Sequence, residues 1–97
     1  MKYSIKFSVF AREDVREIKK HLAQFYLSTP EKFTSELKRC IAMLETTPKM
    51  FEVYECNQNY RKIVVYNYVV FYRIDEERKR VFIYRVLHGK QDREQHL

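Results

Sequence analysis

Two arginines and one histidine in the last third of the chain have side chains suited to an anionic partner. Arg61 opens a β-rich run, Arg85 lies within the apolar run Val81 to Leu87, and His88 precedes Gly89, the only glycine of the chain. A guanidinium group binds carboxylates and phosphates in a bidentate manner, and an imidazole exchanges a proton near neutral pH. These residues are therefore candidates for contact with a nucleic acid or an acidic protein segment.

A charged residue within an apolar strand also has a structural explanation. Arg85 could lie at a sheet edge or pair with an acidic residue elsewhere in the chain. Because side chains alternate along a strand, Val81, Ile83, Arg85 and Leu87 are expected on one face, and His88 starts on the other. Arg85 and His88 converge only if the strand bulges or ends by Leu87. Gly89 would allow this because glycine adopts conformations closed to other residues.

Three runs rich in Val, Ile, Phe and Tyr predict three strands in the C-terminal third. They are Tyr60 to Val65, Tyr68 to Ile74 and Val81 to Leu87, separated by Tyr66-Asn67 and by the charged run Asp75 to Arg80. Consecutive strands with short links predict an antiparallel meander. The second run is apolar enough to be a central strand.

The first half of the chain predicts one strand and two helices. Apolar residues alternate with polar ones at Tyr3, Ile5, Phe7 and Val9, as in a strand with one buried face. A first helix, from Ala11 to near Leu27, would bury Ala11, Val15, Ile18, Leu22 and Phe25. A second helix, after the capping-box pattern Ser28-Thr29-Pro30-Glu31 and before Thr47-Pro48, would bury Phe33, Leu37, Cys40, Ile41 and Leu44.

This element order predicts an α+β fold in a single domain spanning residues 1–97. The two helices, joined by a short link, should form an antiparallel hairpin that packs on the sheet. That hairpin could return the chain to either sheet edge, or the fourth strand could insert beside the first. Residues 49–59 lack a period and predict a loop, which Phe51, Val53 and Tyr54 could pin to the core.

The charge balance favours an acidic partner, because 19 Lys and Arg residues against 13 Asp and Glu residues give a formal charge of +6. Two cysteines are too few for a disulfide framework, and Cys40 is expected to be a reduced core thiol. The absence of an apolar run of signal-peptide or membrane-span length predicts a cytoplasmic protein with no membrane partner. The histidines and cysteines are not spaced as metal ligands are, so the sequence predicts no metal site, and we expect no cofactor.

Over nearly its whole length the chain resembles the RelE/ParE superfamily of toxins from bacterial type II toxin–antitoxin systems. The matching residues are Tyr60-Arg61, Tyr68 through Asp75, and the ending Arg85-Val86-Leu87-His88-Gly89-Lys90-Gln91-Asp92. The superfamily carries two activities on one fold: inhibition of DNA gyrase, as in ParE, and ribosome-dependent cleavage of messenger RNA, as in RelE. Either activity implies a cognate antitoxin that neutralises the toxin in a hetero-oligomer.

Within the superfamily the chain resembles the ParE branch more closely, through its helical hairpin and its ending His-Gly-Lys-Gln-Asp. RelE-type nucleases commonly carry a phosphate-directed arginine at the place of Val69. The resemblance therefore implies a gyrase inhibitor rather than an enzyme, with target contacts at Arg61, Arg73, Arg85, His88 and Lys90. The alternative, a messenger-RNA endonuclease, would use His88 as the acid and Arg61 and Arg85 as phosphate ligands.

Overall fold

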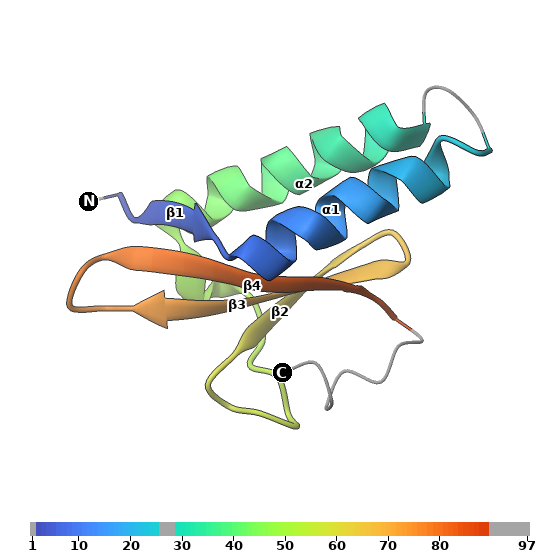
Figure 1. Ribbon diagram of the computed structural model, residues 1–97. Helices are drawn as coiled ribbons and strands as arrows, with labels where there is room; N and C mark the ends of the chain where they lie inside the picture. Colours follow the sequence, from blue (N-terminus) through green and yellow to red (C-terminus); the bar gives the residue numbers. More distant parts are fainter. Residues whose placement is uncertain (1, 26–28, 90–97) are drawn as a thin grey trace.

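Two helices cover one face of a four-stranded sheet in the computed structural model, which describes residues 2–25 and 29–89 (Figure 1). In chain order the elements are β1 (Ser4–Phe7), α1 (Val9–Leu22), α2 (Thr29–Thr46), a 3-10 helix (Pro48–Met50), β2 (Arg61–Val65), β3 (Tyr68–Asp75) and β4 (Arg80–His88). The predicted α+β class and the helical hairpin are confirmed. No helix in the described ranges is both long and apolar enough to cross a membrane.

The sheet has the order β1-β4-β3-β2. Strands β2, β3 and β4 form the predicted antiparallel meander. β1 pairs in parallel with β4, Ser4 opposite Arg80 and Phe7 opposite Ile83. Of the alternatives left open by the sequence, the fourth strand has therefore inserted beside the first.

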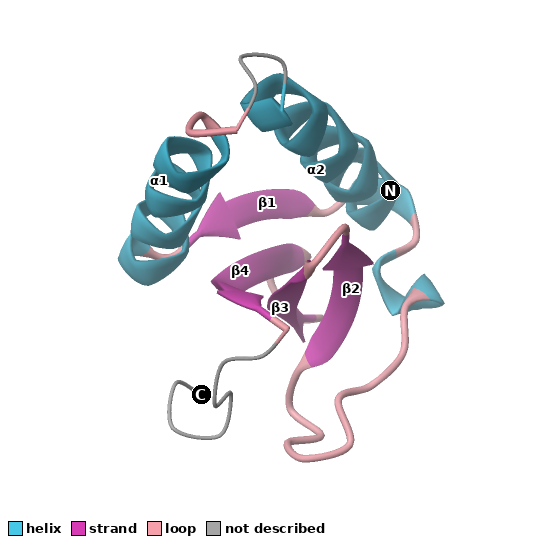
Figure 2. Cartoon of the chain, turned by 90° about the vertical axis from the view of Figure 1, so that its right-hand side faces the viewer, coloured by secondary structure: helices cyan, strands magenta, loops and turns pink. Residues whose placement is uncertain are grey.

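The main core lies between the helices and the sheet (Figure 2). The predicted helical stripes contribute Ala11 and Ile18 from α1, and Phe33, Leu37, Cys40 and Leu44 from α2. β3 is central and buries its first five residues, as the sequence predicts. Burial raises the pKa of the Cys40 thiol, which agrees with its expected role as a reduced core residue.

The boundary between β1 and α1 differs from the prediction. Val9 does not continue the strand; it is the first residue of α1 and its side chain is 81% exposed. Ser8 is responsible, because its Oγ accepts a hydrogen bond from the Ala11 amide at 2.9 Å and caps the helix. The first helix also ends earlier than predicted, at Leu22, and Phe25 is 62% exposed rather than buried. Ser28 of the predicted capping box lies outside the described residues.

A β-bulge in β4 changes which face its last residues occupy. Phe71 pairs with Arg85 but Tyr72 pairs with Ile83, so Tyr84 is the extra residue. Before the bulge Val81 and Ile83 face the helices, and after it Val86 does. The expectation that Arg85 and Leu87 share a face with Ile83 was therefore wrong.

The bulge precedes Arg85, and the strand continues through His88, so Arg85 and His88 stay on opposite faces and the convergence that Gly89 would have allowed does not occur. Gly89 does not have a positive φ. Instead its amide donates to the Asn67 carbonyl at 2.9 Å, which closes the end of the β3–β4 pair.

The segment between the 3-10 helix and β2 covers part of the opposite sheet face. Tyr54 is buried there in a small second cluster with Val69, Phe71 and Leu87. Phe51 packs on the main core, whereas Val53 is 42% exposed. Two of the three predicted anchors of this loop are thus confirmed.

Replacing Ile18 or Leu37 by Ala should lower the free energy of unfolding by about 2–5 kcal/mol, because each change leaves a cavity in the core. Lys19→Ala, on the exposed side of the same helix, should change it by less than about 0.5 kcal/mol. Denaturant titration measures both. Equal losses at Ile18 and Lys19 would contradict the observed orientation of α1.

Candidate functional site

Arg85 forms a bidentate ion pair with Asp14 of α1. Its Nε donates to Asp14 Oδ2 at 2.7 Å and its Nη2 to Oδ1 at 2.9 Å. The two side chains are only 17% and 14% exposed, and the hydrogen bond from Arg85 raises the pKa of the guanidinium. The guanidinium also lies 5.8 Å from the centre of the Phe10 ring. The structural alternative for Arg85, pairing with an acidic residue elsewhere in the chain, is what the structure contains.

Asp14 also takes the place of a missing strand. β1 ends at Phe7, and within residues 2–25 and 29–89 no strand covers that edge of β4 beyond Ile83. There the Asp14 Oδ2 accepts a hydrogen bond from the Val86 amide at 3.0 Å. One carboxylate thus satisfies a backbone donor and a cation that would otherwise lie part-buried without partners.

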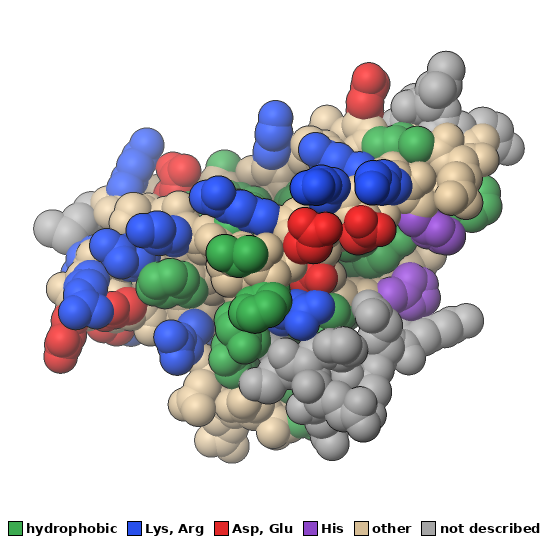
Figure 3. All heavy atoms as spheres, viewed as in Figure 1, with side chains coloured by type: hydrophobic (Ala, Val, Ile, Leu, Met, Phe, Trp, Pro, Cys, Tyr) green, Lys and Arg blue, Asp and Glu red, His purple; other side chains and the backbone are tan. Residues whose placement is uncertain are grey.

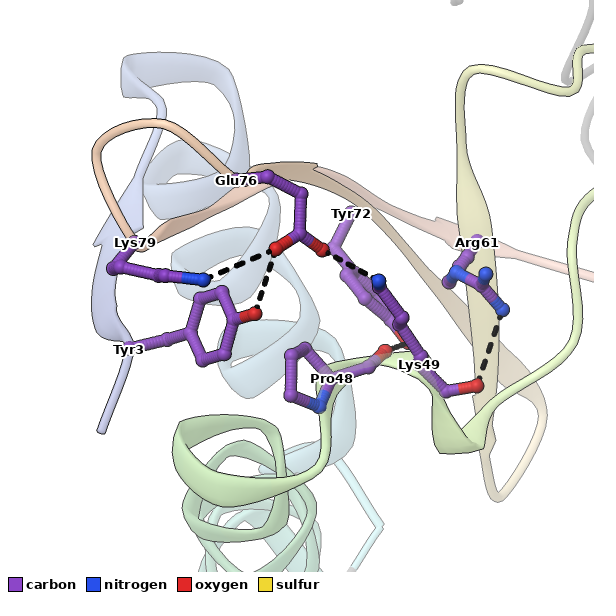
Figure 4. Close-up of polar contacts among 7 residues, drawn as sticks. All are labelled: Tyr3, Pro48, Lys49, Arg61, Tyr72, Glu76 and Lys79. Atoms are coloured by element: carbon purple, nitrogen blue, oxygen red, sulfur yellow. Dashed lines mark hydrogen bonds and ion pairs between the residues drawn. The ribbon is translucent and has the colours of Figure 1, made fainter. Parts of the chain in front are cut away.

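Arg61 holds the 3-10 helix and the residue that follows it (Figure 4). Its Nη1 donates to the carbonyl oxygens of Phe51 at 2.6 Å and of Lys49 at 3.2 Å. The Tyr72 hydroxyl donates to the Pro48 carbonyl at 2.6 Å, and burial raises the pKa of this phenol well above its usual range. Arg61 and Tyr72, which pair across β2 and β3, therefore anchor the same segment.

Glu76, in the turn between β3 and β4, links three elements in Figure 4. Its carboxylate accepts a hydrogen bond from the Tyr3 hydroxyl at 2.9 Å and pairs with Lys49 at 3.0 Å and Lys79 at 3.5 Å. The contact with Lys49 is the main cause that lowers the pKa of Glu76. No sequence pattern predicts this cluster, because its members come from three segments far apart in the chain.

His88 lies at the far end of β4. Its ring contacts Tyr68 edge-on at 5.4 Å and lines a hollow of about 330 Å³ together with His21 and Tyr66. Asp14, the partner of Arg85, precedes His21 by seven residues on α1, which corresponds to about 10 Å along a helix axis. Arg85 and His88 therefore lie beside two parts of α1 that are about 10 Å apart.

The sheet face opposite the helices carries a mixed basic and aromatic surface near the start of β4. Lys6 pairs with Phe82, and Phe82 pairs with Arg73, so these three lie side by side on neighbouring strands. The Arg80 guanidinium lies 5.8 Å from the Phe82 ring centre, and the Tyr84 and Tyr60 rings are 5.4 Å apart. We call Lys6, Arg73, Arg80, Phe82 and Tyr84 the basic–aromatic face.

Of the predicted target contacts that the structure describes, only Arg73 belongs to this face. Arg61 and Arg85 are engaged in contacts within the molecule, and Lys90 lies outside the described residues. His88 follows Phe82 by six residues on β4, or about 20 Å at the rise of an extended strand. The sequence analysis missed Lys6, Arg80 and Phe82. Alternation along β4 could have placed Arg80 and Phe82 on one face, but Lys6 joins them only through the register of β1 with β4. No group of acidic, histidine or cysteine side chains among the described residues could hold a metal ion.

Comparison with protein-family models matches residues 5–93 to the ParE toxin of type II toxin–antitoxin systems, parDE. No curated protein sequence matches the chain.

Solved structures of toxins share the fold. The chromosomal ParDE system from P. aeruginosa gives a TM-score of 0.71 at 16% identity, covering 90% of this chain and 96% of that one. The isolated E. coli RelE toxin gives 0.63 at 17% identity, covering 96% and 90%. The RelBE2 toxin–antitoxin complex from Mycobacterium tuberculosis gives 0.61 at 22% identity, covering 91% and 99%. These likenesses concern the fold alone, and the family match over residues 5–93 confirms the resemblance to the RelE/ParE superfamily.

The Asp14–Arg85 pair should contribute measurably to stability. A double-mutant cycle with Asp14→Ala and Arg85→Ala should give a coupling free energy of about 1–3 kcal/mol, because the pair is part-buried and bidentate. Asp14→Ala should be the more damaging single change, since it also removes the acceptor of the Val86 amide. Chemical denaturation measures all three variants.

The exposed pair Glu17–Lys20 on the same helix serves as the control. Its cycle should give less than about 0.5 kcal/mol. A coupling at Asp14–Arg85 no larger than this control would show that the pair is incidental.

Proposed function

Since the chain belongs to the ParE toxin family of type II toxin–antitoxin systems, we propose that it arrests bacterial growth by inhibiting DNA gyrase in the cytoplasm, until a cognate antitoxin neutralises it. The observation that carries the proposal is the basic–aromatic face, which offers binding groups without the parts of a nuclease. An inhibitor that acts by binding its target needs a surface complementary to the target in shape and charge, and it needs no proton-transfer pair.

Cleavage of RNA requires a base, an acid and cations gathered at one phosphate. In the described ranges, the candidate acid His88 lies about 20 Å along β4 from the position of Arg73, much farther than one phosphodiester extends. The two cations proposed with it are occupied, Arg85 by Asp14 and Arg61 by backbone carbonyls. This separation favours the binding mechanism over the nuclease mechanism.

We assign direct target contact first to Arg73, with Lys6 and Arg80 beside it. Arg73 is exposed, and Phe82 next to it supplies an apolar surface for a partner to bury. Arg61 and Arg85 act as positioning residues, because their hydrogen bonds fix the segments on which the sheet depends. His88, the last residue of β4, and Lys90, which lies outside the described residues, are further proposed contacts with the same target.

Charge reversal on the basic–aromatic face should weaken gyrase inhibition. Arg73→Glu or Arg80→Glu should raise the concentration for half-inhibition of DNA supercoiling by about 10-fold or more, because each change replaces attraction to an acidic surface by repulsion. Lys20→Glu, the same charge change on α1, should leave inhibition unchanged. Purified gyrase with relaxed plasmid provides the measurement, and equal effects at positions 20 and 73 would contradict the assignment.

His88→Ala separates the two toxin mechanisms. On the gyrase proposal this change should weaken inhibition only modestly, and the wild-type chain should leave ribosome-bound messenger RNA intact. Cleavage of messenger RNA by the wild type, slowed by about 10²–10⁴-fold in His88→Ala with ribosome binding retained, would overturn the proposal in favour of the endonuclease.

A further inference from the structure

A hollow of about 330 Å³ lies where the tip of the helical hairpin meets the end of the sheet. The end of α1 and the start of α2 form one side of it, and the turn between β2 and β3 and the last residue of β4 form the other. Figure 1 shows this turn, in yellow, beneath the end of α1. The volume is near the lower limit for small-molecule sites, so the hollow is large enough for one small ligand.

The floor of the hollow is a row of rings in edge-on contact. Phe33 of α2 contacts Tyr68 of β3 with ring centres 5.4 Å apart, and Tyr68 contacts His88 at the same distance. Phe33 and Tyr68 are buried, so core packing fixes their rings. At the rim, His21 contacts Phe25 edge-on at 5.3 Å, and Phe25 is 62% exposed. A flat apolar group that enters the hollow therefore meets a preformed surface of rings.

The wall of the hollow favours an anion. Within residues 2–25 and 29–89, no acidic side chain lines it. Its cation is Lys32, which forms no ion pair in the same ranges; Glu36, one helical turn away, binds Arg39 instead. The His21 imidazole and the Thr29 hydroxyl line the same wall and can donate to oxygen atoms. Figure 3 shows the two described histidines, in purple, close together at this end of the molecule.

Tyr66 lies in the turn that borders the hollow, and its backbone is strained. Its φ is 56°, in the left-handed region that residues other than glycine rarely adopt. Tyr66 is 61% exposed, and within the described residues its side chain forms no hydrogen bond or ring contact. Glycine would fill this position without strain, so the tyrosine side chain is not explained by the fold. Strained backbone of this kind is typical of functional positions.

We propose that this hollow binds a nucleoside monophosphate, with its phosphate on Lys32 and its base against the ring of Tyr66. An aromatic ring stacks on any nucleobase, and an ammonium group forms a charge-assisted hydrogen bond with phosphate. Asn67, which lines the same hollow, can hydrogen-bond the edge of the base through its amide. The proposal goes beyond gyrase inhibition, because it involves neither gyrase nor the basic–aromatic face.

The two halves of the ligand should depend on each other. Inorganic phosphate leaves the rings uncovered, and a nucleoside leaves Lys32 without an anion. In isothermal titration calorimetry with the full chain, a ribonucleoside 5′-monophosphate should therefore bind at least about 10-fold more tightly than the nucleoside or inorganic phosphate alone.

Lys32→Gln tests the phosphate contact. It should raise Kd for the monophosphate by about 10-fold, because it removes the charge and keeps most of the side-chain volume. Lys38→Gln is the matched control: it makes the same change on α2 at a residue that does not line the hollow, and it should bind like the wild type.

Tyr66→Gly removes the ring and relieves the backbone strain in one change. The variant should unfold at a temperature no lower than the wild type, yet Kd for the monophosphate should rise by about 10-fold. Tyr66→Phe keeps the ring and should bind like the wild type. Lys79→Gly is the control for strain: Lys79 is the only other described non-glycine residue with a positive φ, and it does not line the hollow. Its substitution should leave nucleotide binding unchanged.

Three results would overturn the proposal. They are a wild-type chain that binds no ribonucleoside monophosphate at millimolar concentration or binds inorganic phosphate equally well, wild-type affinity in Lys32→Gln or Tyr66→Gly, and tighter binding of a 5′-phosphorylated oligonucleotide than of the monophosphate. The last result would assign the hollow to the end of a nucleic acid strand. Since no assay here contains gyrase, failure of the gyrase proposal would leave these measurements unaffected.

Discussion

The carboxylate of Asp14 sets the arrangement of the rest of the molecule. A sheet of this order needs β4 in its interior, yet β1 is only four residues long and covers less than half of β4. An uncovered strand edge leaves backbone N–H and C=O groups unpaired, and water or another chain can then bind them. Asp14 completes the edge from a helix instead of a strand, and by binding Arg85 it fixes α1 against β4. The α1 helix, and with it the helical hairpin, is held against the sheet by this contact.

Much of the fold follows from local pattern in the sequence. The stripes of α1 and α2 and the apolar run of β3 identified the core, because periodic burial is encoded in neighbouring residues. Two features were not predictable in this way. The bulge at Tyr84 depends on how β4 must meet both β3 and α1, and the pairing of Asp14 with Arg85 joins residues 71 positions apart. A single extra residue in a strand reverses the face of every residue after it, which is why Leu87 was misplaced.

The same limit applies to the site. Arg61, Arg85 and His88 stand out by residue type, but the structure gives the two arginines partners within the chain and places His88 at the far end of β4. The basic–aromatic face was less visible because each of its members is ordinary for its strand, and only the register of β1, β4 and β3 brings Lys6, Phe82 and Arg73 together.

The parallel pairing of β1 with β4 has a consequence for how the chain is made. Ser4 finds its partner at Arg80, 76 positions later, so the sheet cannot close until the last strand has left the ribosome. Contacts of such long sequence separation form late and slow the folding of small proteins. A nascent chain that has reached only β3 lacks the strand that joins the two halves of the sheet. During each round of translation there is therefore an interval in which the toxin has been partly made but its sheet is not yet complete.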